Sequence, residues 1–404
     1  MFRQFIGLPR QVYLLAVVRC VMAMGTFVFA FISLLASTRL GMDEFQIGHV
    51  MFFVALANVG GSLAGGKLAD LAGRRPVFLA ADGLAVASIW AAGALCDTPW
   101  VLVFVILSYA FSSMSLPVIA AMITDTSGLE NRTECFSVLY LSQNLGYAIG
   151  PSIGGLLFNN YMQWAFYGQG ILYALSGLCM IFLVKDRYVP APRAPRETRA
   201  EPRREGLLAA LVHRPVVLAF VFCLILLTIC YQEISFILPL QFTDMFGVAD
   251  GSRYAGFMWT VNAVVCLLFT PALINLFKRR NQLLNIAFAA LLYAVGFALN
   301  GLVDQIWMFY AAVAVWTSGE ILVSTGAGVF IANRAPETHR ARFQSLYEMA
   351  RGFGRGIGPN IFGYYLLTHT YRQTWLGISA ICIAAILFLA ALYRAEKRSR
   401  LAGV

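Results

Sequence analysis

Twelve long apolar runs occupy most of this 404-residue sequence, and they restrict the chain to one class of fold. A helix that crosses a bilayer needs about 20 apolar residues, and each run reaches that length. The runs cover residues 12–37, 46–69, 76–96, 99–124, 134–158, 164–184, 215–242, 253–277, 281–302, 305–332, 343–367 and 373–394. Only 12% of the residues are charged, whereas soluble domains carry about 25%. We therefore expect an all-α membrane protein with 12 transmembrane helices.

One hydrophilic segment divides the runs six and six. Residues 185–214 are rich in proline, arginine and glutamate, and they have almost no apolar content before Leu207. We therefore predict an N-terminal six-helix bundle at residues 1–184, a cytoplasmic linker at residues 185–214 and a C-terminal six-helix bundle at residues 215–404.

Lysine and arginine mark the cytoplasmic loops of membrane proteins, and here they gather in alternate loops. The basic clusters are the linker, Arg74 with Arg75, residues 278–280, Arg334 with Arg340 and Arg342, and the tail from Arg394 to Arg400. The net charge of +10 therefore indicates membrane orientation rather than nucleic-acid binding. We predict that both termini and the linker are cytoplasmic, and that the protein lies in the plasma (cell inner) membrane.

A glycine–proline segment occurs twice, 208 positions apart, as GYAIGPSIGG from Gly146 to Gly155 and as GRGIGPNIFG from Gly354 to Gly363. Small residues let membrane helices approach closely, and neighbouring helices can satisfy the backbone groups that proline frees. The positions concerned are Gly146, Gly150, Pro151, Gly154, Gly155, Gly354, Gly358 and Pro359. We interpret them as hinges of a parallel repeat, with a substrate site between two halves that rock against each other. The alternative is that they only pack helices together.

Several ionisable residues interrupt the apolar runs, where a charge is costly and therefore indicates function. Glu320 lies 14 residues before Arg334, which the helical rise places about 21 Å from the cytoplasmic end. Arg355 lies at a similar depth, so the two are predicted to pair. Two roles are possible for Glu320: it either carries protons or forms a permanent salt bridge with Arg355 that exchanges none.

Other charges within the runs are Arg19, Glu233, Glu348 and Arg351. Arg19 would either bind an anionic group of a substrate or extend to the cytoplasmic surface. We expect this set, with Glu320 and Arg355, to serve proton coupling or to line the substrate cavity.

The loop after the second run, GGKLADLAGRRPVF at residues 65–78, resembles the loop signature of the major facilitator superfamily. The matches are Gly66, Leu68, Ala69, Asp70, Gly73, Arg74 and Arg75, and Leu71 departs from the usual arginine. The resemblance implies the twelve-helix major facilitator fold of two pseudo-symmetric bundles. It also implies a cytoplasmic gate. In this gate Gly66 allows a close approach to a neighbouring helix end, and Gly73 forms the tight turn of the loop. Asp70 would bind to a helix of the other half, and Arg74 would pair with Asp125. The alternative is a cytoplasmic turn with solvated charges.

The first glycine–proline segment is similar to the fifth-span motif G-x-x-x-G-P-x-x-G-G of antiporters in the same superfamily. Glu320 resembles the acidic position that drug:proton antiporters use for coupling, and Tyr231 and Asn262 fit the same pattern. The fourth run departs from those antiporters because it has no arginine. The role in proton relay that such an arginine has would therefore fall to Arg19 or to charged residues of the second half.

Together these features predict a secondary active transporter that works by alternating access. The expected activity is proton-coupled efflux of a small amphiphilic compound or drug, and the alternative is proton-coupled transport of an anionic metabolite or a lysolipid-like substrate. We expect no enzymatic activity, because the four histidines lie near run ends and form no cluster. We also expect a monomer with a small-molecule substrate, with no metal and with the proton in place of a cofactor.

Overall fold

The computed structural model describes residues 7–128, 131–184, 215–277, 279–334 and 340–401. Within helices it leaves out the side chains of residues 133, 332–333, 340–350 and 399–401, and the predicted linker at 185–214 lies outside the described residues. The described chain is helical and contains no strand. Its α-helices are α1 (Arg10–Met24), α2 (Ile32–Thr38), α3 (Glu44–Ala72), α4 (Arg74–Ala94), α5 (Trp100–Thr126), α6 (Arg132–Phe158), α7 (Met162–Leu183), α9 (Pro215–Phe277), α10 (Gln282–Leu302), α11 (Ile306–Arg334), α12 (Arg340–Leu366) and α13 (Tyr371–Leu401).

Every predicted apolar run coincides with a helix, and nine helical stretches among the described residues are long and apolar enough to cross a membrane. One of these stretches joins α1 and α2, and another is the 63-residue α9, which contains two predicted runs. α9 changes direction at Gly247, whose φ of 80° is a conformation that favours glycine. The two glycine–proline helices, α6 and α12, are 27 residues long but less apolar, since they pack mainly against other helices.

The first predicted span is broken, which the sequence did not indicate. α1 ends at Met24, and a short 3-10 helix, η2 (Phe29–Phe31), separates it from α2. The break frees backbone groups inside the bundle, and the side chain of Gln169 accepts a hydrogen bond of 3.0 Å from the Val28 amide. A side chain thus satisfies a backbone group that water cannot reach.

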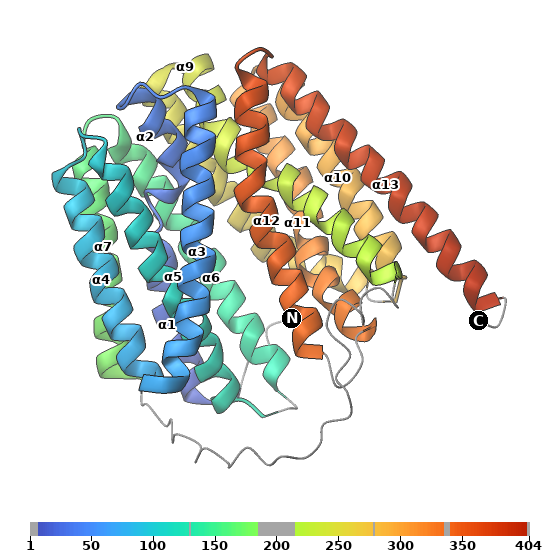
Figure 1. Cartoon of the computed structure of the whole chain (residues 1–404), viewed down its shortest axis with the longest axis horizontal. Coiled ribbons are helices and arrows are strands. Elements are labelled where there is room, and N and C mark those ends of the chain that lie inside the picture. Colours follow the sequence, from blue (N-terminus) through green and yellow to red (C-terminus); the bar gives the residue numbers. More distant parts are fainter. Residues whose placement is uncertain (1–6, 129–130, 185–214, 278, 335–339, 402–404) are drawn as a thin grey trace.

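Helices before residue 184 gather on one side of the molecule and helices after residue 215 on the other (Figure 1). We call these groups the first and second halves. The linker end is the end of the bundle where α7 stops and α9 begins, and the far end is the opposite one. The halves meet through two helix pairs, α3 with α12 and α6 with α9.

The two helix pairs use equivalent contacts, which reveals the internal repeat in three dimensions. A Cβ atom added to Gly155 would lie 2.5 Å from the Ser252 carbonyl oxygen, and one added to Gly363 would lie 2.3 Å from that of Glu44. Gly256 stands equally close to Pro151, as Gly48 does to Pro359. Each member of one contact lies 208 positions from its counterpart in the other, so the repeat seen in sequence is a structural repeat.

α3 and α12 lie together at the far end and diverge toward the linker end (Figure 1). At the far end, the Asn360 side chain donates a 3.1 Å hydrogen bond to the Gly48 carbonyl. The contact continues to Gly352, where an added Cβ would lie 3.1 Å from Val59. This structure therefore represents a conformation in which the far end is closed along the α3–α12 pair.

Candidate functional site

Glu320 on α11 lies where the inner helices of the second half converge. The Asn262 side-chain amide, on the second part of α9, donates to Glu320 Oε2 at 2.8 Å and to Thr317 Oγ1 at 2.9 Å. Thr317 precedes Glu320 by three residues, so both side chains lie on one face of α11. The association of Asn262 with Glu320 confirms that these two predicted residues share a site, and Thr317 is a member that the sequence analysis missed.

Two further groups reach the Glu320 carboxylate. Tyr231, on the first part of α9, lies close enough to interact with it. Arg351 on α12 is the cation whose charge acts on it. No ion pair joins Glu320 to Arg355 among the described side chains, so the predicted pairing with Arg355 is wrong. The two arginines are one helical turn apart on α12, and helical rise alone could not tell which one faces α11.

The first half also contributes to this site. Tyr140 on α6 is close enough to Glu320 and to Cys266 to interact with both. Its hydroxyl is buried and has no hydrogen-bond partner in the described structure. The α6–α9 contact that brings Tyr140 here is one of the two contacts between halves, so a movement of the halves would change the surroundings of Glu320.

The other predicted charges occupy separate places. Arg355 is exposed and lines a cavity between the halves, beside Gln232. Glu233 is 0% exposed, and neither of its carboxylate oxygens has a hydrogen-bond partner among the described residues. A Cβ added to Gly358 would lie 2.4 Å from Glu233 Oε1, so this carboxyl packs directly on the second glycine–proline segment. The side chain of Glu348 lies outside the described residues.

Arg19 is 9% exposed and lies within the first half, on α1. Its Nη1 atom is 3.9 Å from the Met22 sulfur, and its charge also acts on Tyr173 of α7. This burial argues against extension to the membrane surface, because a snorkelling side chain keeps its charged head in water.

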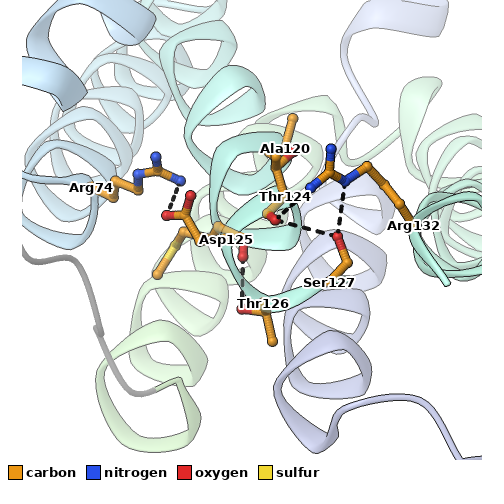
Figure 2. A network of polar contacts seen from close by, with 8 residues as sticks. Arg74, Ala120, Thr124, Asp125, Thr126, Ser127 and Arg132 are labelled. Carbon is orange, nitrogen blue, oxygen red and sulfur yellow. Dashed lines mark hydrogen bonds and ion pairs between the residues drawn. The ribbon is translucent and has the colours of Figure 1, made fainter. Parts of the chain in front are cut away.

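The linker end of the first half contains the predicted pair of Arg74 and Asp125, and the structure confirms that ion pair. Figure 2 shows Arg74, at the start of α4, and Arg132, at the start of α6, approaching the last turn of α5 from two sides. Arg132 donates to the Thr124 carbonyl and to Ser127 Oγ, both at 3.4 Å. Cations at a helix C-terminus are favoured by the helix dipole, so these two arginines fasten three helices of one half together.

The glycines of the gate motif differ in their roles. Gly73 has a φ of 93° between α3 and α4, which confirms the predicted tight turn. The close approach predicted for Gly66 is wrong, since an added Cβ would meet only Pro117 at an ordinary 3.8 Å. The tight contact belongs instead to Gly65, where a Cβ would lie 2.3 Å from the Met114 carbonyl oxygen. Asp70 is exposed near the end of α3.

No group of three or more histidine, cysteine, aspartate or glutamate side chains with the spacing of a metal site occurs among the described residues. Hydrogen bonds and single charges therefore define the candidate site. Its core is Glu320 with Asn262, Thr317, Tyr231 and Arg351.

Known proteins resemble the chain over most of its length. It is 25% identical to a Na(+), Li(+), K(+)/H(+) antiporter of Planococcus maritimus over 357 residues, covering 82% of this chain and 84% of that protein. It is 23% identical to the multidrug resistance protein MdtH of Cronobacter sakazakii over 388 residues, covering 93% and 92%.

Solved structures agree on the fold. A mutant of the nucleoside transporter NupG superposes with a TM-score of 0.79 at 16% identity and covers 95% of this chain and 100% of that one. The peptide transporter POT bound to sulfate gives a TM-score of 0.78 at 16% identity and covers 98% and 96%. The profile of the Major Facilitator Superfamily matches residues 15–359. The chain therefore belongs to the Major Facilitator Superfamily.

Proposed function

We propose that the protein exports a small amphiphilic compound in exchange for protons, with Glu320 as the proton carrier. The observation that carries this proposal is the position of Glu320, whose carboxylate accepts a hydrogen bond from Asn262 and lies beside Tyr231 at the meeting point of α9, α11 and α12. An ionisable group within a transmembrane bundle is costly, so its retention indicates use in transport.

The surroundings of Glu320 suggest how a proton would be exchanged. The hydrogen bond from Asn262 and the positive charge of Arg351 favour the ionised carboxylate, whereas partial burial favours the protonated one. A movement of α6 against α9 would shift Tyr140 and alter that balance. Glu320 would then accept a proton in one conformation and release it in the other.

The relatives and the motifs support export as the direction of transport. The relatives named above are an antiporter and a multidrug resistance protein, and the first glycine–proline segment has the antiporter pattern. We infer that the linker end faces the cytoplasm, that Asp70 helps to close it, and that a monomer in the plasma membrane completes the cycle without an organic cofactor.

The decisive experiment compares Glu320→Gln with the parent protein in proteoliposomes that carry an imposed pH gradient. We expect Glu320→Gln to lower pH-driven transport of an amphiphilic dye at least tenfold, because the amide cannot carry the proton. Glu320→Asp should retain part of the activity. Glu44→Gln, in the first turn of α3, is the matched control and should transport normally. Normal pH-driven transport by Glu320→Gln would remove Glu320 from the mechanism.

A second candidate function is exchange of monovalent cations for protons. Glu320 Oε2 and Thr317 Oγ1 both lie within 2.9 Å of the Asn262 amide, so two oxygen atoms that suit a small cation face the same point. A relative named as a Na(+), Li(+), K(+)/H(+) antiporter supports testing it. Addition of each salt to the same proteoliposomes, with an internal pH indicator, separates the candidates: a cation exchanger releases protons without any dye.

A further inference from the structure

We propose that Arg355, together with Gln232 and Asn58, binds the anionic group of an amphiphilic substrate in a cavity between the two halves. The inference rests on the proposed transport function and names the class of substrate: one negatively charged head, such as a carboxylate, sulfonate or phosphate, on an apolar body.

Residues of both halves line the cavity. Its volume is about 40 Å³, and it is lined by Phe29, Met51, Val54, Ala55, Asn58, Gln232 and Arg355. A single water occupies roughly 10–15 Å³ on this scale, so the cavity has room for about three waters or for a head group of similar size. The rest of a substrate would extend from it between the halves.

The polar part of the lining suits an anion. Arg355 is the charged residue of the lining, and a guanidinium presents donors in a planar fork that matches carboxylate and phosphate oxygens. Gln232 is positioned by its own helix, since its amide donates to Ser235 Oγ at 2.6 Å. Two side-chain amides and one guanidinium supply donors, and none of the described residues of the lining carries a carboxylate that would repel an anion.

The glycines of α12 set the distance between Arg355 and the first half. An added Cβ on Gly356 would lie 3.3 Å from Phe52 and 3.4 Å from Ala55. A Cβ on Gly352 would lie 3.1 Å from Val59. These glycines let α12 lie directly on α3, so that a side chain of the second half reaches a cavity wall made by the first half.

The remaining lining is apolar and belongs to the first half. Phe29, Met51 and Val54 form this wall, and Phe29 is fixed by an edge contact with Tyr109 at 5.5 Å between ring centroids. An apolar wall opposite a single cation fits an amphiphile rather than a polar metabolite. The repeat places Tyr147 in the first half at the position equivalent to Arg355 in the second half. Of these two equivalent positions, only the one in the second half therefore carries a positive charge.

The proposal determines the charge that moves in each cycle. If one proton enters as one anion leaves, two charges cross the membrane in the same electrical sense. Transport of the anion then depends on the membrane potential as well as on the pH gradient, because moving each charge across the potential changes the free energy of the cycle. A neutral substrate would move half as much charge, and a monovalent cation none.

Three probes with one apolar body test the substrate class in proteoliposomes: naphthalene-2-sulfonate, 2-naphthalenemethanol and (2-naphthyl)methyl-trimethylammonium. We expect the sulfonate to be taken up at least tenfold faster than the ammonium compound, and faster still with an inside-positive potential. Arg355→Gln should lower sulfonate uptake at least tenfold, and Arg355→Lys should lower it less. The matched control is Arg253→Gln, since Arg253 is exposed and pairs with Asp250.

Each outcome separates this inference from the proposed function. Unchanged sulfonate uptake by Arg355→Gln, a preference for the ammonium probe, or no uptake of any probe would overturn the anion site. In each of those cases, loss of pH-driven dye transport in Glu320→Gln would leave proton coupling standing. Retention of pH-driven transport in Glu320→Gln would instead overturn the proposed function.

Discussion

At the scale of single residues, two carboxyl groups within the helices of the second half, Glu320 and Glu233, have opposite surroundings. Glu320 has a donor from Asn262 at 2.8 Å and lies near the charge of Arg351. Within the part of the chain that the structure describes, neither oxygen of Glu233 has a hydrogen-bond partner, and the side chain packs against Gly358. An ionised carboxylate without a partner costs several kcal/mol in such a place, so Glu233 is suited to the uncharged state in this conformation.

Glu233→Gln should therefore fold at least as well as the parent protein. The amide keeps the shape of the side chain and removes the possibility of a buried charge, so we expect an equal or higher melting temperature in detergent. Glu396→Gln is the comparison, because Glu396 accepts a 2.7 Å hydrogen bond from Arg334 and its loss leaves a partly buried cation without its carboxylate. A melting temperature that falls more in Glu233→Gln than in Glu396→Gln would contradict this reading.

At the scale of helices, the glycine–proline segments act through close backbone contact. A Cβ on Gly150 would lie 2.2 Å from the Met24 carbonyl oxygen, just before the break in the first span. In the other copy, a Cβ on Gly354 would lie 2.6 Å from Thr228. The interpretation that these segments pack helices is confirmed, and their role as hinges stays a prediction.

Gly150→Ala is expected to destabilise the protein. Alanine favours a helix over glycine by about 1 kcal/mol, but here the added methyl group would force α6 away from α1, at a cost of about 1–3 kcal/mol. Gly83→Ala on α4 is the matched control, since nothing lies within 4 Å of its added Cβ. Thermal unfolding in detergent should show a lower midpoint for Gly150→Ala and an unchanged or higher one for Gly83→Ala. Equal midpoints would contradict this prediction, because they would mean that α1 shifts to accommodate the methyl group with no loss of stability.

At the scale of the whole molecule, this conformation is packed at the far end along α3 and α12, and these helices diverge toward the linker end (Figure 1). The ion pair of Arg74 with Asp125 lies entirely within the first half. It therefore holds one bundle together and does not require the linker end to be closed. The contact between halves proposed for Asp70 belongs to the opposite conformation.

Asp70→Asn should therefore increase the population of the conformation seen here. Spin labels at Leu71 and Leu276, which are exposed near the ends of α3 and α9 in different halves, report the separation of the linker ends. We expect the distance distribution to shift toward the longer component in Asp70→Asn, because a contact of the closed state is lost. Asp97→Asn, in the loop between α4 and α5, should leave the distribution unchanged. Identical distributions in both variants would exclude the latch.

The helices and the internal repeat could be predicted from the amino-acid sequence alone. Apolar length predicts spanning helices because a bilayer accepts only backbone that is hydrogen-bonded internally, and the predicted runs coincide with helices. The resemblance of the loop to a known signature was enough to predict the turn at Gly73 and the ion pair of Arg74 with Asp125, since both depend on neighbours in the chain or on adjacent helices.

Only the tertiary structure decided which residues of different helices meet. Helical rise gives the depth of a side chain but not its direction around the axis, so Arg351 rather than Arg355 proved to be the cation near Glu320. At the break after Met24, the Val28 amide donates to Gln169, a residue 141 positions away on another helix. The contribution of Tyr140 to the Glu320 site likewise depends on how the two halves pack, and helix packing is set by contacts that no single stretch of sequence contains.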